Sequence, residues 1–103
     1  ASDVYKRQAH YLIAQIDIKD REKYAEYEAG FMDVFTSYKG KLLSVDENVS
    51  LLEGQWPATR TVLIEFPSKE EALAWYESEE YQSLAKHRFA ASTSDIAVIS
   101  GLD

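Results

Sequence analysis

The side chains that could carry chemistry in this sequence are two arginines, Arg60 and Arg88, and one histidine, His87. A guanidinium group can bind a carboxylate through two parallel hydrogen bonds, and an imidazole titrates near neutral pH. We therefore take His87 as the candidate acid or base. The candidate ligand-binding residues are Arg60, Arg88, Trp56, Tyr24, Tyr27, Glu53 and Asp17.

Each candidate also has a purely structural interpretation, which the sequence leaves open. Arg60 can pair with Glu53 or Asp17, because an inward guanidinium usually needs a fixed partner. The two tyrosines can be core residues of an amphipathic helix, and Trp56 can cover the end of a hairpin. His87 and Arg88 lie near the end of a predicted helix, where the helix dipole stabilises cations whether or not a ligand is bound.

Other classes of site find little support. The chain has no cysteine, which excludes disulfides, thiolate nucleophiles and cysteine-bound metal. The two histidines, His10 and His87, stand in no metal-binding spacing, and there is no glycine-rich phosphate loop. We therefore expect neither a metal nor a cofactor. A net charge of −7 disfavours nucleic acid as a partner.

The first eight residues have no apolar run and no periodicity, and we expect them to be a disordered tail or a cloning remnant. Residues 9–103 then form a single domain. No stretch of about 18 apolar residues is present, so no membrane span is predicted. The default expectation is a soluble cytoplasmic protein.

Two helical regions are predicted. Asp20 can cap the first, in which aromatic residues recur every three or four positions until Gly40. Ser68 begins a capping box for the second, which should break near Ser78 and resume to about His87.

Four strands flank these helices. Alternation of side chains predicts strands at 9–17 and 59–66, with Arg60 on the same face as Val62 and Ile64. Residues 41–53 read as a long strand with a bulge or bend at 46–48, and residues 95–100 as a short last strand. A turn at 54–57 makes the two middle strands a hairpin.

The resulting order, β-α-β-β-α-β, predicts a ferredoxin-like α+β fold with both helical regions on one face of a four-stranded antiparallel sheet. The other face, which includes Tyr11, Ile13 and Leu63, is left bare, and we expect a homodimer to cover it. The same topology gathers the candidate site residues at one end of the sheet, in a cleft between sheet and helices.

Two segments carry a resemblance to a known family. Residues 52–68 (LEGQWPATRTVLIEFPS) and 74–82 (AWYESEEYQ) resemble the domain-of-unknown-function 1330 family, and Tyr11-Leu-Ile and the Tyr24-x-x-Tyr27 spacing fit its opening. The resemblance covers about residues 9–102. It implies a dimeric α+β barrel like that of antibiotic-biosynthesis monooxygenases and muconolactone isomerases, several of which work without a cofactor. One departure is the acidic segment 44–48, where the family tends to carry an arginine and a glycine pair.

Two functions remain open. The first is a cofactor-independent isomerase or monooxygenase acting on a small aromatic or carboxylated molecule, with Arg60 or Arg88 binding the anion and His87 moving a proton. The alternative is a homodimer without turnover, which binds a small ligand or is purely structural. An open pocket with inward polar groups would favour the enzyme. A closed cleft would favour the purely structural homodimer.

Overall fold

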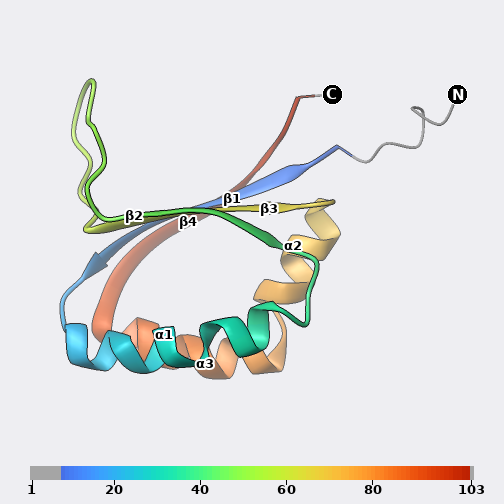
Figure 1. Cartoon of the computed structure of the whole chain (residues 1–103), viewed down its shortest axis with the longest axis horizontal. Coiled ribbons are helices and arrows are strands. Elements are labelled where there is room, and N and C mark those ends of the chain that lie inside the picture. Colours follow the sequence, from blue (N-terminus) through green and yellow to red (C-terminus); the bar gives the residue numbers. More distant parts are fainter. Residues whose placement is uncertain (1–7, 103) are drawn as a thin grey trace, which may run out of the picture.

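Four strands form one antiparallel sheet with three helices packed against one of its faces in the computed structural model, which describes residues 8–102 (Figure 1). The order of strands across the sheet is β2-β3-β1-β4. The elements are β1 (His10–Ile18), α1 (Arg21–Phe35), β2 (Lys41–Asp46), β3 (Arg60–Phe66), α2 (Lys69–Tyr76), α3 (Glu79–Ala91) and β4 (Ser92–Ser100). The predicted ferredoxin-like α+β fold is confirmed. Of the tail predicted for residues 1–8, all but the exposed Gln8 lies outside the described residues.

The three helices begin where the sequence predicts. The side chains of Asp20, Ser68 and Ser78 each accept a hydrogen bond from the backbone N–H three residues later, at 3.1, 3.2 and 3.1 Å. These contacts satisfy N–H groups that have no partner within the helix. The break predicted near Ser78 is therefore the start of a separate helix, α3.

The predicted end of the first helix at Gly40 is wrong, because α1 ends at Phe35 and the chain then turns. Gly40 is needed for another reason. A Cβ atom at this position would lie 2.7 Å from ring carbons of both Phe35 and Phe66. The glycine lets the backbone approach these two aromatic side chains, instead of ending the helix.

The boundaries of two strands also differ from the prediction. β2 ends at Asp46, and its bulge lies between Leu42 and Ser44 instead of at 46–48. Residues 47–59 form a loop that extends away from the helices (Figure 1). α3 continues past His87 to Ala91, whose carbonyl accepts the N–H groups that precede α1, and β4 therefore starts earlier, at Ser92.

The core follows from the alternation in the two central strands. Leu12, Ala14 and Ile16 of β1 are buried on the helix side, as are the alternate residues of β3 from Val62 to Phe66. Helix α2 contributes Trp75, whose ring centroid lies 4.3 Å from that of Tyr81. This aromatic packing fixes the helices over the sheet.

The opposite face of the sheet carries no helix (Figure 1). Ile13 of β1 lies between Leu63 of β3 and Ala97 of β4 in the strand register, and Tyr11 lies next to it on the same face. The three residues expected to be bare are only partly buried in a single chain. In the described part of the chain, no helix is long and apolar enough to cross a membrane.

Candidate functional site

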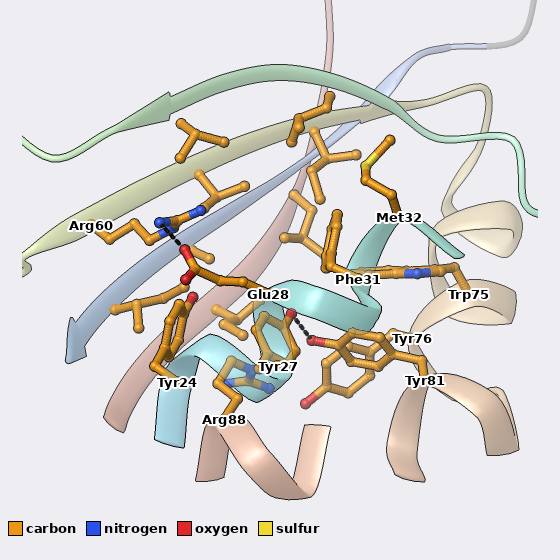
Figure 2. A pocket seen from close by; sticks show the side chains of 18 residues that line it. Tyr24, Tyr27, Glu28, Phe31, Met32, Arg60, Trp75, Tyr76, Tyr81 and Arg88 are labelled. Atoms are coloured by element: carbon orange, nitrogen blue, oxygen red, sulfur yellow. Dashed lines mark hydrogen bonds and ion pairs between the residues drawn. The ribbon is translucent and has the colours of Figure 1, made fainter. Parts of the chain in front are cut away.

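A cavity of about 190 Å³ lies between the helices and the sheet (Figure 2). Aliphatic side chains of the strands line one side: Leu12, Ala14, Ile16, Leu42, Val45, Val62, Ile64 and Ile96. Helix side chains line the other: Tyr24, Tyr27, Phe31, Met32, Trp75, Tyr76 and Tyr81. The charged lining residues are Glu28, Arg60 and Arg88. Leu42, Val45 and Met32 are also exposed, which places the mouth of the cavity between β2 and α1.

Arg88 is a buried cation without a carboxylate partner among residues 8–102. Its side chain comes from the last turn of α3, and the residue is only 3% exposed. One nitrogen, Nη1, donates to Ser94 Oγ at 2.8 Å, and the guanidinium carbon lies 5.8 Å from the Tyr27 ring centroid. Burial opposes the charge, whereas Tyr81 and Tyr27, which carry charge only when they ionise at high pH, raise the pKa of Arg88; a guanidinium is cationic at neutral pH in any case.

Buried hydrogen-bond donors without a partner belong to residues that line this cavity. Within residues 8–102, the buried side-chain polar atoms without a hydrogen bond are Arg60 Nε, Trp75 Nε1, Arg88 Nε and Arg88 Nη2. All four are donors, and all three residues line the cavity. Buried donors usually have partners, so this set indicates a place for a molecule that supplies acceptors.

Arg60 points toward the helices, as the strand alternation predicts, and its side chain is 19% exposed. Its expected pairing with Asp17 or Glu53 is wrong. Its Nη1 donates to Glu28 Oε2 at 2.8 Å and to Glu47 Oε2 at 3.0 Å, because α1 brings Glu28 over β3. Arg60 also lies over the Tyr24 ring, not at its hydroxyl, with 5.6 Å between the guanidinium carbon and the ring centroid.

Glu47 extends this ion pair into a small network. Arg21 donates to both of its carboxylate oxygens at 3.1 Å. The hydrogen bonds from Arg21, together with those from Arg60, hold the pKa of Glu47 below its ordinary value. The acidic segment 44–48 thus supplies a carboxylate that pairs with a cavity arginine.

Two buried tyrosines of the cavity, Tyr24 and Tyr27, keep their protons near neutral pH. The hydroxyls of Tyr27 and Tyr81 share a buried hydrogen bond of 2.7 Å (Figure 2). Burial raises the pKa of Tyr27, and it raises the pKa of Tyr24 to about 12 against an opposing effect of Arg60. Neither phenol loses its proton near neutral pH, so neither can serve as a base there.

His87 is not on the cavity wall. Its side chain is 47% exposed, and Nδ1 lies 3.8 Å from Glu26 Oε1, at the outer side of α1 and α3. Neighbouring helix residues point about 100° apart, so the burial of Arg88 directs His87 outward. The structure does not bring the candidate acid or base to the cavity.

Three other candidate residues also lie away from the cavity lining. Asp17 forms an exposed pair with Lys19 at 2.7 Å, and Glu53 is exposed in the loop after β2. Trp56 Nε1 donates to Thr61 Oγ1 at 2.8 Å, which places the indole against the helix-free face of the sheet. Of the eight candidates, the cavity gathers Tyr24, Tyr27, Arg60 and Arg88.

Several cavity residues were not among the candidates: Glu28, Phe31, Met32, Trp75, Tyr76 and Tyr81. The sequence carried a signal for one of these residues, Tyr81, because it shares a helix stripe with the candidate Arg88. Arg88 follows Tyr81 and Ala85 at seven and three residues, which puts a charge on the apolar stripe of its helix. In residues 8–102, no group of three or more histidine, aspartate or glutamate side chains could hold a metal ion.

Solved structures share this fold. A protein of unknown function from Rhodopseudomonas palustris is 18% identical, with a TM-score of 0.78, over 100% of this chain and 95% of its own. SnoaB, a cofactor-independent oxygenase from Streptomyces nogalater, is 12% identical, with a TM-score of 0.64, over 93% of this chain and 95% of its own. A dimeric ferredoxin-like protein of unknown function from Thermobifida fusca is 8% identical, with a TM-score of 0.67, over 92% of each chain. At these identities the likeness concerns the fold alone.

No curated protein matches the sequence significantly. Residues 9–102 match the family described as a domain of unknown function, DUF1330. The match includes every helix and strand of the structure, as well as the two segments that carry the resemblance. This chain belongs to the DUF1330 family.

Proposed function

We propose that the cavity binds a small aromatic or carboxylated molecule whose anionic group pairs with Arg88. The observation that carries this proposal is the buried guanidinium of Arg88, which has a serine hydroxyl and no carboxylate as its partner among the described residues. An unpaired buried charge is costly to a fold, and an anionic ligand would relieve that cost.

The cavity suits such a molecule in size and lining. A cavity of about 150 Å³ can hold benzene, and this one, at about 190 Å³, leaves room for substituents. Phe31, Tyr27 and Trp75 offer ring faces and edges to a planar ligand. A mostly apolar lining with a few convergent polar groups is typical of small-molecule sites.

As the activity of this site we propose cofactor-independent isomerisation or oxygenation. Removal of a proton from a phenol, or from carbon beside a carbonyl, leaves charge on oxygen, and the unpartnered donors of Arg88 and Arg60 can stabilise that oxyanion. Return of the proton to another carbon completes an isomerisation, whereas reaction of the anion with O₂ as the oxidant completes an oxygenation. Glu28 is the carboxylate on the wall that could accept the proton. The fold shared with a cofactor-independent oxygenase supports this reading.

Binding without turnover is the second candidate, and one contact favours it. Glu28 already accepts a hydrogen bond from Arg60 at 2.8 Å, which makes it a weak base. A purely structural dimer is less favoured, because the cleft is open. Oxygen consumption and product analysis with a bound phenol or enol, in wild type and Glu28→Gln, separate turnover from binding.

The binding proposal is tested by calorimetric titration of the protein with benzoate. We expect Arg88→Met to weaken benzoate binding by about tenfold or more, because a hydrogen bond to a charged group contributes roughly 1.5–3 kcal/mol. Lys86→Met is the matched control, since it removes the same charge from an exposed position on α3. Equal binding by wild type and Arg88→Met would contradict the proposal.

We also propose that the chain forms a homodimer through the helix-free face of the sheet, with Tyr11, Ile13 and Leu63 in the interface. Support comes from the partly exposed apolar side chains on this face and from a dimeric structural neighbour. The cytoplasmic location expected from the sequence stays a prediction.

A further inference from the structure

We infer that the two cavity arginines bind different parts of one ligand, so that Arg88 pairs with its negative charge and Arg60 donates to a neutral oxygen, such as a carbonyl. The ligand would be an aromatic monoanion with a carbonyl group on the far side of its ring. This inference rests on the proposed function and adds a substrate class to it.

The two guanidinium groups differ in how their charge is compensated. Arg60 contacts two carboxylates, those of Glu28 and Glu47, and Glu47 is also paired with Arg21. The network of Arg21, Arg60, Glu28 and Glu47 therefore has no net charge. Arg88 donates to the hydroxyl of Ser94 and has no carboxylate partner in the described residues. An anion therefore gains most at Arg88, where it meets an uncompensated charge.

Arg60 still has a donor to offer. Its Nη1 is shared by both carboxylates, at 2.8 and 3.0 Å, whereas its Nε is buried without a partner within residues 8–102. Because carboxylates already balance the charge of this guanidinium, its one remaining buried N–H suits a neutral acceptor. A second carboxylate placed there would face the like charges of Glu28 and Glu47, which disfavours a dianion.

Two tyrosine rings of the cavity wall lie near the two arginines. Arg60 lies over Tyr24, and Arg88 lies beside Tyr27, with the two tyrosine ring centroids 5.3 Å apart (Figure 2). The two tyrosine rings are tilted by 47°, and the inferred ligand ring packs against them with opposite substituents directed toward the two guanidinium groups. The unpartnered buried atoms at both ends are donors, so both substituents should be acceptors.

Calorimetric titration of the wild-type protein with four probes tests this inference: benzoate, 4-isopropylbenzoate, 4-acetylbenzoate and terephthalate. The isopropyl and acetyl groups have similar shapes, but only the acetyl group has an oxygen. We expect 4-acetylbenzoate to bind about fivefold more tightly than 4-isopropylbenzoate, as one net hydrogen bond provides. Terephthalate, a dianion at pH 7, should bind more weakly than 4-acetylbenzoate.

Two variants test whether Arg60 and its partner Glu47 cause these differences in affinity. Arg60→Met should equalise the acetyl and isopropyl affinities. Because this change can weaken the fold, Glu47→Gln gives an independent readout at a residue outside the cavity lining. Removing this carboxylate uncovers part of the Arg60 charge, and terephthalate should then gain at least about threefold relative to 4-acetylbenzoate, a modest fraction of one like-charge contact.

The outcomes separate this inference from the proposed function. If no probe binds wild type, or if Arg88→Met binds benzoate unchanged, the anion site itself is refuted. If benzoate binds through Arg88 but the acetyl group gives no advantage, or terephthalate binds most tightly, the role of Arg60 is refuted and the anion site stands. An unchanged terephthalate ratio in Glu47→Gln also refutes the charge argument.

Discussion

Replacing Arg88 with methionine should stabilise the protein in the absence of ligand, although loss of a buried charged residue usually destabilises. Methionine fills a similar apolar space and removes two buried N–H groups without partners, each of which costs about 1–3 kcal/mol. The change also loses the hydrogen bond to Ser94 and the contacts with the Tyr27 and Phe89 rings, together about 2–3 kcal/mol. We expect a net gain of about 1 kcal/mol in the free energy of unfolding.

Arg60→Met should instead lower the free energy of unfolding. It leaves Glu28 and Glu47 without their shared cation, but their side chains are 42% and 38% exposed, so water partly compensates. A loss of about 1–2 kcal/mol is expected, below the roughly 3–5 kcal/mol of a fully buried pair.

Urea unfolding followed by tryptophan fluorescence, at one protein concentration and pH 7, measures both variants. Each kcal/mol corresponds to a shift of about 0.3–1 M in the urea midpoint, for a slope of about 1–3 kcal/mol per M. Lys86→Met, on the exposed side of α3, should change little. If Arg88→Met destabilises by more than about 1 kcal/mol, the guanidinium is already satisfied within the protein and the argument for a ligand at Arg88 fails.

Three further predictions concern assembly and pH. Leu63→Asp should convert the proposed dimer to a folded monomer, because it places a carboxylate in the apolar interface; sedimentation of wild type as a monomer at micromolar concentration would contradict the dimer. Hydrogen bonds, mainly from Arg21, hold the pKa of the Glu47 carboxyl below its ordinary value of 4.5, so this carboxylate stabilises the fold above pH 4.5. The contribution is lost as the pH falls below 4.5 toward the lowered pKa. Urea midpoints between pH 7 and 3 should therefore fall more steeply for wild type than for Glu47→Gln, and parallel curves would refute the coupling. Because burial raises the pKa of Tyr24 from 10.0 to about 12, stability should fall by about 2 kcal/mol between pH 10 and 12, and less in Tyr24→Phe; equal losses would contradict this burial effect.

The fold could be predicted because its signals are local. Asp20, Ser68 and Ser78 mark helix starts by a contact only three residues long, and alternation in β1 and β3 fixes which face is buried. The same alternation correctly directed Arg60 toward the helices. Gly40 was misread because its small size serves a contact with Phe66, which is distant in sequence.

The candidate site was only half predictable, because its other half depends on helix rotation and loop path. His87 and Arg88 are neighbours in sequence, and the rotation of α3 buries one and exposes the other. Trp56 belongs to a loop whose path takes the indole to the helix-free face. The partner of Arg60 on α1, Glu28, was identifiable only from the packing of that helix over β3.

The bulge in β2 has a consequence for aggregation. β2 and β4 are the two outer strands of the sheet, and each leaves a row of backbone groups that another chain could pair with. In β2 the register shift between Leu42 and Ser44 interrupts that row within six residues. β4, by contrast, is regular over nine residues in its pairing with β1, and its outer edge offers a continuous template. Unwanted strand addition, under conditions that promote fibres, should therefore begin at β4.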